Sequence, residues 1–577
     1  MNAKRALALC LALLLCPLSA FATAAEGESP INRRIDRNTA KTLDFQPEAA
    51  RARTDSVVIG VSDLIGDVNP FWAATTGDNY AASLLCDELV FADNSGNAGP
   101  GVATFTVSAD GRTYTFTLRD GVRYADGEPV RSEDYINAIY LLLTPGYDGV
   151  YSLESAGIEG VEAYLTGEAE AISGVTRVDD RTFTVTFATS SPAQLLYLGI
   201  PALRVATVGD LRRPEGLAGD LAFDAFYESS VASAREADIA ALSYGQYFLE
   251  SMTPGDTATF VKNADYWRGT PYIGTIELLV VPQGEELAAI MEGTVDIISM
   301  LGSVEAVDEV ADFEKGFINL YTWEGNIVGY LAMDPDNEIF ADLNVRKALA
   351  TGFDRDAARM SRIERYGSLP TMLLFDGFSP SAADMLEEQY PYDYEAASQL
   401  LDDAGWTMGE DGYRYRDGKA LAFTLVYNVP NPVVDSIMQQ LLPGYHMLGI
   451  QASTEALSFE EILPRIESGD YDMCFQAREL PASAGLAADL FAGLASDEML
   501  ARLERMAVAE NDPTRQTVLY EMFFQELYLD LSIIPLYRRS EFLLVNARVM
   551  NLTITSAHDL TADAYRMFLT DTLEGQW

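Results

Sequence analysis

The chain has 577 residues, of which 48% are hydrophobic and 22% are charged. This composition is typical of a folded, soluble protein rather than a disordered one, and the length suggests about three or four domains. The 39 basic and 87 acidic residues give a formal net charge of −48, so nucleic acid and anionic membrane surfaces are poor partners. Because acidity also serves solubility, it does not by itself indicate a cationic ligand.

The N-terminus has the pattern of a secretory signal peptide. Lys4 and Arg5 precede an apolar run over residues 6–15, and small residues follow near Ala22. We therefore expect residues 1–24 to be cleaved and the protein to act in the periplasm or at the extracellular face of the membrane. A lipid anchor is not supported, because a leucine rather than a small residue precedes both Cys10 and Cys16.

Residues 25–54 are polar and lack a sustained period, so they are interpreted as a flexible spacer. A short β-branched strand is predicted over residues 56–62, followed by a loop and by a helix over residues 80–90. Loss of the signal peptide leaves Cys86 and Cys474. Two buried free thiols are expected for them, and a disulfide remains an alternative.

Residues 111–143 carry the densest local signals. Apolar side chains alternate with threonines from Thr113 to Leu118, which predicts a strand with one buried face, and Asp110-Gly111 before it predicts a tight hairpin turn. A helix is predicted from Ser132, whose hydroxyl can accept from its first free amides. Together, the turn at Asp110-Gly111 and the strand after it predict a hairpin over residues 102–118.

This strand, turn and helix resemble the pattern shared by family 5 extracellular solute-binding proteins, the peptide and nickel binders of ABC transporters. Further motifs of that family occur in the expected order along the chain, both before and after this stretch, so the resemblance covers residues 55–577. They are Asn69-Pro70-Phe71-Trp72, Asn263 to Trp267, Val345 to Leu349, Phe353-Asp354-Arg355, Ala404-Gly405-Trp406 and Leu531 to Tyr537.

The resemblance implies an α/β, two-lobed periplasmic-binding-protein fold (type II, cluster C-like) with an extra subdomain inserted in the first lobe. Lobe I is expected to combine residues 55–91, 175–282 and 530–577. The inserted subdomain is expected at residues 92–174 and lobe II at residues 283–529.

Enzyme chemistry finds no support in the motifs. The chain lacks a GxSxG elbow, a Walker-type phosphate loop and a GxGxxG stretch. His446 and His558 have no nearby cysteines that would complete a zinc set, and the acidic stretch 334–342 lacks the loop glycine of an EF-hand. We therefore predict no catalytic residue, no metal site and no cofactor, and we interpret the acidic stretch as a solvated loop.

The resemblance instead implies a ligand site between two lobes, which close around the solute. The loops that match the family's cleft-lining segments supply the candidate residues. These are Asn69, Phe71, Trp72, Trp323, Asn326, Tyr427, Asn428, Gln476, Arg478, Glu479 and Tyr537.

One loop departs from the family pattern. Peptide-binding relatives tend to have glycine-tryptophan here, then an aspartate that pairs with the peptide's amino group. Residues 474–485 contain neither tryptophan nor aspartate, and the next aspartate is Asp489. Glu479 could replace the aspartate, or Arg478 could direct the site toward a carboxylate, because a guanidinium can hold two oxygens at once.

The resemblance thus predicts a monomeric protein that captures a small solute and delivers it to an ABC permease. An oligopeptide is the first hypothesis for that solute. A non-peptide ligand such as a metal chelate, a sugar or an opine-like compound is the alternative within the same fold. An exported hydrolase is the alternative from another class, and turnover of a bound ligand would distinguish it.

Overall fold

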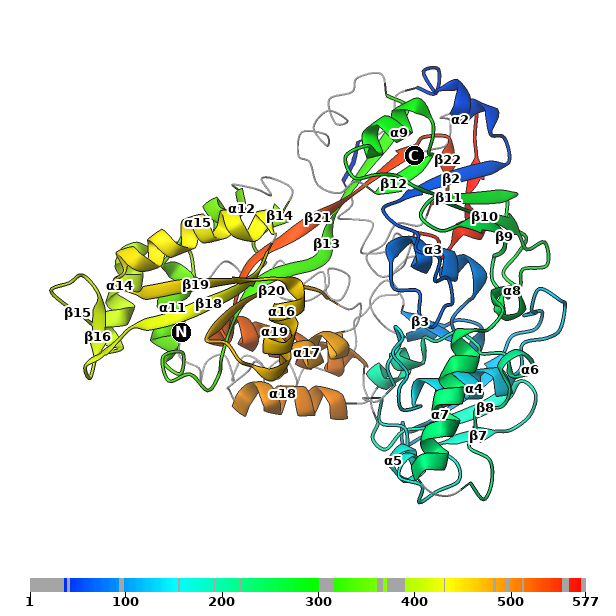
Figure 1. Ribbon diagram of the computed structural model, residues 1–577, viewed down its shortest axis with the longest axis horizontal. Helices are drawn as coiled ribbons and strands as arrows, with labels where there is room; N and C mark the ends of the chain where they lie inside the picture. Colours follow the sequence, from blue (N-terminus) through cyan, green and yellow to red (C-terminus); the bar gives the residue numbers. More distant parts are fainter. Residues whose placement is uncertain are drawn as a thin grey trace, which may run out of the picture.

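The computed structural model describes residues 36–38, 42–92, 98–153, 156–190, 192–217, 220–299, 316–360, 367–370, 390–429, 431–480, 484–492, 498–510, 513–552 and 560–571. The predicted signal peptide and His558 lie outside these residues. The chain forms two bodies joined by a pair of long strands (Figure 1).

One long mixed sheet runs through both bodies. Among the described residues, its path starts in lobe II, passes through the two joining strands and ends in lobe I. In spatial order the strands are β19 (Gln451–Leu457), β18 (Ala422–Asn428), β20 (Met473–Glu479), β13 (Ile318–Met333), β21 (Ile533–Asn546), β12 (Ile297–Ser299), β2 (Ser56–Val61), β11 (Thr275–Val280), β10 (Thr257–Lys262) and β9 (Tyr247–Thr253).

Strands β13 and β21 carry the chain between the lobes. Trp323 lies opposite Glu541 in the lobe I half of the pair, and Val328 lies opposite Arg538 in the lobe II half. The register shifts between these halves, so residues 325–327 of β13 stand opposite Arg539 alone. Such an irregularity bends a strand and increases its twist, which suits a hinge.

This pairing puts the boundaries of the lobes elsewhere than expected. Lobe II was predicted to begin near residue 283, but β12 pairs with β2 and β21, and residues 318–323 pair with the lobe I half of β21. The chain therefore first crosses at residues 324–328 and returns at residues 538–540. The long-range pairing of these strands, which local patterns do not specify, decides the boundary.

Part of the predicted spacer packs on lobe I. Helix α2 (Glu48–Ala52) includes the fully buried Ala50, whose carbonyl oxygen accepts from the guanidinium of Arg548. Arg53 forms an ion pair of 3.0 Å with Asp296, and β1 (Asp36–Asn38) pairs with β13. Residues 48–53 are therefore not a flexible spacer. Local sequence patterns did not indicate this, because the partners of these residues lie hundreds of residues away in sequence.

The inserted subdomain contains a separate sheet with the order β5 (Ala103–Val107), β6 (Thr113–Leu118), β8 (Thr182–Thr186) and β7 (Val175–Arg177). The β5–β6 pair confirms the predicted hairpin, and Gly111 in its turn has a φ of 72°. Since β8 completes this sheet, the subdomain extends beyond residue 174.

Helix α4 (Ser132–Leu142) forms where predicted, but Ser132 is not its cap. The Ser132 hydroxyl donates to the carbonyl oxygen of Asp179 at 2.5 Å. The carboxylate of Asp134 accepts from the Arg131 amide at 2.9 Å and closes the helix start. The serine is drawn into a tertiary contact with the subdomain sheet that the local pattern does not reveal.

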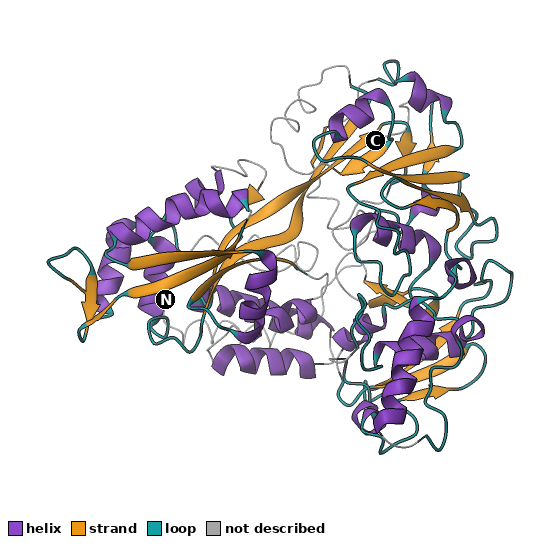
Figure 2. Cartoon of the chain, in the orientation of Figure 1, coloured by secondary structure: helices purple, strands orange, loops and turns teal. Residues whose placement is uncertain are grey.

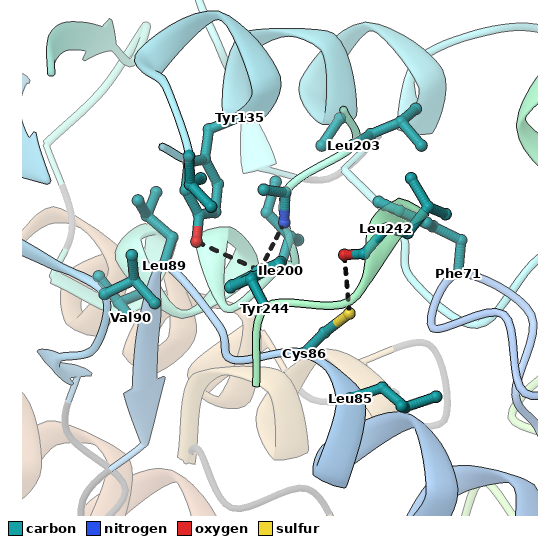
Figure 3. Packing of buried hydrophobic residues seen from close by; sticks show 14 of the residues in the cluster. Phe71, Leu85, Cys86, Leu89, Val90, Tyr135, Ile200, Leu203, Leu242 and Tyr244 are labelled. Atoms are coloured by element: carbon teal, nitrogen blue, oxygen red, sulfur yellow. Dashed lines mark hydrogen bonds between the residues drawn. The ribbon is translucent and has the colours of Figure 1, made fainter. Parts of the chain in front are cut away.

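Buried side chains join the subdomain to lobe I (Figure 3). The hydroxyl groups of Tyr135 and Tyr244 lie 3.3 Å apart, and the thiol of Cys86 donates to the carbonyl oxygen of Leu242 at 3.6 Å. Cys86 and Cys474 are both buried and free. The expectation of two free thiols is therefore confirmed.

Lobe II has helices on both faces of its part of the sheet (Figures 1 and 2). One face packs against α11 (Leu343–Thr351), α14 (Tyr394–Asp403) and α15 (Pro432–Met447). The other face packs against α17 (Ala484–Ala492), α18 (Glu498–Ala509) and α19 (Pro513–Asp530).

Two of the family motifs have structural roles within lobe II. Arg346 forms a buried ion pair of 2.6 Å with Asp530, which joins α11 to the end of α19. Gly405 follows α14 with a φ of 83°, as expected for a glycine that ends a helix. These motifs support the fold and lie apart from the predicted ligand contacts.

Candidate functional site

The three lobe I candidates are packed inside that lobe. Asn69 is 3% exposed, and its amide donates to the carbonyl oxygen of Ala234 at 2.9 Å. Phe71 is fully buried (Figure 3). Trp72 is 5% exposed, and its indole nitrogen donates to the carboxylate of Asp148 at 2.8 Å. In this conformation these side chains hold the inserted subdomain against lobe I.

Trp323 and Asn326 lie on the crossing segment of β13. Trp323 is partly buried, packs against the lobe I core and stands opposite Glu541 of β21. The carbonyl oxygen of Asn326, which is 8% exposed, accepts from the amide of Leu480 at 3.0 Å. The end of β20 is therefore attached to the hinge by its backbone.

Tyr427 and Asn428 end strand β18 in lobe II. Tyr427 packs partly buried against the lobe II core. The side-chain oxygen of Asn428 accepts from the side-chain amide of Asn431 at 3.2 Å, and the side-chain oxygen of Asn431 caps α15. These two residues lie on the strand beyond β20, so β20 separates them from the hinge strands.

Strand β20 brings the other lobe II candidates to the hinge. Gln476 lies opposite Tyr330, Arg478 opposite Val328, and Glu479 opposite Ile327. Gln476 is 5% exposed, Arg478 is half-buried and Glu479 is exposed. Because side chains alternate along a strand, Gln476 and Arg478 share one face and Glu479 belongs to the other.

A chain of hydrogen bonds fixes the first of these faces. The Tyr330 hydroxyl donates to the side-chain oxygen of Gln476 at 3.0 Å, and the same oxygen accepts from Nε of Arg478 at 3.2 Å. Tyr330 is fully buried. Desolvation raises the pKa of Tyr330 well above its usual value, so it remains a neutral donor.

Tyr537 lies in β21 opposite Gly329. It is 4% exposed, and its ring stacks on Phe475 with centroids 6.4 Å apart. Burial raises the pKa of Tyr537 to about 12. The ring belongs to the lobe II core, so in this conformation Tyr537 supports the hinge by packing.

The opposite face of the hinge carries two carboxylates and one guanidinium group. Burial raises the pKa of the half-buried Glu541, Arg539 lowers it, and the charge of Glu479 raises it further. Glu479 therefore lies close enough to Glu541 to repel it. The two carboxylates make this side of the crossing segment less favourable for an anionic ligand than the Arg478 side.

Arg538 and Tyr330 lie at this junction, although the sequence patterns did not predict them. Arg538 is 4% exposed and lies across Val328 from Arg478. Its signal in the sequence was a pair of arginines directly after the apolar run from Ile533 to Tyr537. Only the strand register shows that Arg538 and Arg478 share a face.

The described residues contain neither a candidate metal site nor a candidate membrane span. Within the described ranges, no group of three or more histidine, cysteine, aspartate or glutamate side chains could hold an ion. The ring of His446 is hydrogen-bonded at 2.9 Å to the carbonyl oxygen of Ala452. No helix in this part of the chain is both long and apolar enough to span a bilayer.

The two lobes, the paired strands between them and the polar residues gathered at that junction define a two-lobed binding protein. A model of bacterial extracellular solute-binding proteins, family 5 middle, matches residues 97–480. The chain belongs to this family of solute-binding proteins, and the predicted fold class is confirmed.

Individual proteins show the same similarity over most of the chain. The oligopeptide-binding protein OppA of Lactococcus lactis subsp. lactis is 24% identical over 496 residues, covering 79% of each chain. The structure of the oligopeptide-binding protein AppA from Bacillus subtilis with a nonapeptide has 17% identity and a TM-score of 0.65, covering 90% of this chain and 99% of that one. NikA from Brucella suis with Fe(III)-EDTA has 20% identity and a TM-score of 0.69, covering 89% and 100%.

Proposed function

We propose that this protein captures an oligopeptide outside the cytoplasm, between its two lobes, and delivers it to an ABC permease. The observation that supports this best is the hinge. Only β13 and β21 of the main sheet pass between the described parts of the lobes, and their register breaks at residues 325–327. Two rigid bodies joined in this way can close around a solute and open again.

The class of solute is proposed from the similarity to known proteins. The OppA and AppA proteins to which the chain is similar are oligopeptide-binding proteins. Residues 1–24 would direct export and be removed, and the protein would bind its solute as a monomer without chemical turnover. The candidate ligand contacts are those of the hinge and of β20, led by Trp323, Gln476 and Arg478.

The departing loop favours a second candidate, a non-peptide solute such as a metal chelate. Half-buried Arg478 lies in a segment, residues 474–485, that contains no tryptophan, and no aspartate follows it within residues 479–488. NikA, which has the same fold, is described in complex with Fe(III)-EDTA. That ligand is anionic and is not a peptide.

Native mass spectrometry of the protein purified from its own host tests the two candidates. A series of bound masses that fit mixed peptides supports the oligopeptide, whereas a single non-peptide mass refutes it. The retained solute is then added back to stripped protein, and small-angle scattering measures closure. Conversion of the solute into a product would instead support the hydrolase.

A further inference from the structure

The end of β20 reaches the hinge between the lobes. Strand β20 runs antiparallel to β13, so its last residues lie beside the crossing segment. Arg478 and Arg538 flank Val328 from the two neighbouring strands and share its face of the sheet. Two strand spacings separate their Cα atoms by roughly 10 Å. Arg538 is 4% exposed and Arg478 is half-buried, so Arg478 is the more accessible of the two.

Arg478 is held in a defined position. Its Nε donates to Gln476 at 3.2 Å, and Gln476 is held by the buried Tyr330 hydroxyl at 3.0 Å. The Nε bond leaves the two terminal nitrogens of the guanidinium, which form an edge that matches the two oxygens of a carboxylate. Fixing a long side chain in advance reduces the entropy lost when a ligand binds.

The charge of Arg478 is not balanced by a carboxylate among the described residues. The chain has 87 acidic residues, yet none of those described lies within ion-pair distance of Arg478. Three other lobe II arginines do have such partners: Arg346 pairs with Asp530, Arg414 with Asp402 and Arg465 with Glu455. The adjacent Glu479 belongs to the other face of β20 and interacts with Glu541.

We propose that Arg478, positioned by Gln476 and Tyr330, binds a carboxylate of the captured solute. The site is therefore selective for solutes that carry a free carboxylate, and it has the charge opposite to that needed to hold an amino group. The carboxylate is either the C-terminus of a short peptide or part of a small organic acid. This inference rests on the proposed function, because it names the chemistry of the solute that the lobes enclose.

The experiment presents stripped full-length protein with three pools and identifies retained members by native mass spectrometry. The first pool holds tripeptides to pentapeptides with free C-termini, the second holds the same peptides as C-terminal amides, and the third holds small mono- and dicarboxylic acids. The best retained member is titrated by calorimetry against the wild type, Arg478→Gln, Arg478→Lys and Arg502→Gln. Arg502 lies on the exposed side of α18 in the same lobe and serves as the charge-matched control.

Retention of free acids over amides, with at least a tenfold loss of affinity in Arg478→Gln and no loss in Arg502→Gln, supports the proposal. Arg478→Lys should recover only part of the affinity, because an ammonium group cannot form the two parallel hydrogen bonds. The first pool identifies a peptide terminus and the third an organic acid.

Equal retention of acids and amides, or unchanged affinity in Arg478→Gln, overturns the carboxylate site while solute binding stands. If no member of any pool is retained, the carboxylate site is also overturned. If, in addition, protein from its own host carries no solute, the proposed function fails as well. Circular dichroism and melting of each variant confirm that a lost affinity is not a lost fold.

Discussion

A β-carbon at Gly329 would lie 2.4 Å from Cε1 of the Tyr537 ring. These residues face each other across the two strands that join the lobes. Contact this close leaves no room for any other side chain at residue 329, and the ring cannot move freely because it stacks on Phe475. The hinge is therefore tightly packed at the point where it enters lobe II.

Replacing Gly329 with alanine should destabilise the protein by about 1–3 kcal/mol, the usual cost of overpacking a core. Urea unfolding followed by circular dichroism measures this change. If the clash is the cause, the double variant Gly329→Ala/Tyr537→Leu should lose less stability than the sum of the two single variants. Strict additivity would show that the ring is not what excludes the methyl group.

The buried ion pair of Arg346 and Asp530 provides a second test. Its side chains are 7% and 9% exposed, and removing one partner leaves a buried charge unpaired. Asp530→Ala should cost about 3–5 kcal/mol. The control Arg212→Gln breaks the exposed pair with Asp210 and should change stability by less than about 1 kcal/mol. Equal effects in the same unfolding assay would contradict the distinction.

Asp87 should make stability depend on pH. Burial raises its pKa to about 6, although hydrogen bonds from Trp267 and Tyr266 and the charge of Arg268 lower it. The folded state therefore holds a proton that the unfolded state has lost near pH 4. The stabilisation by Asp87 is complete below that pH and is lost as pH rises through 6.

The measurement compares wild type and Asp87→Asn at pH 5 and pH 8. The stability of the wild type relative to the variant should fall by roughly 1.4 kcal/mol over this range, since one pKa unit corresponds to that energy. Other carboxylates, including the nearby Asp563, are common to both proteins and largely cancel in the difference. A difference that stays constant with pH would refute the raised pKa.

The two cysteines should resist modification in the folded protein. Burial raises the pKa of Cys474 to about 12 and raises that of Cys86 further, so neither provides much thiolate at neutral pH. Mass spectrometry after treatment with iodoacetamide should find no adduct on native protein and two adducts after unfolding without reductant. A mass that shows no alkylation until reductant is added would instead indicate a disulfide.

Local patterns determined the elements that depend on neighbouring residues. The alternation from Thr113 to Leu118, the turn at Gly111 and the helix end at Gly405 each follow from side-chain period or from backbone freedom. The order of the motifs also indicated the family and therefore the two-lobed fold. The predicted strand, turn and helix end agree with the structure because each depends on only a few consecutive residues.

The tertiary structure alone decided the candidate site. It placed Phe71 and Trp72 in the core of lobe I and moved the lobe boundary to residues 324–328. It also brought Arg538 to the same face as Arg478. Strand register between segments more than 200 residues apart, such as those of Val328 and Arg538, depends on the packing of the whole sheet. The sequence near each residue does not contain that information.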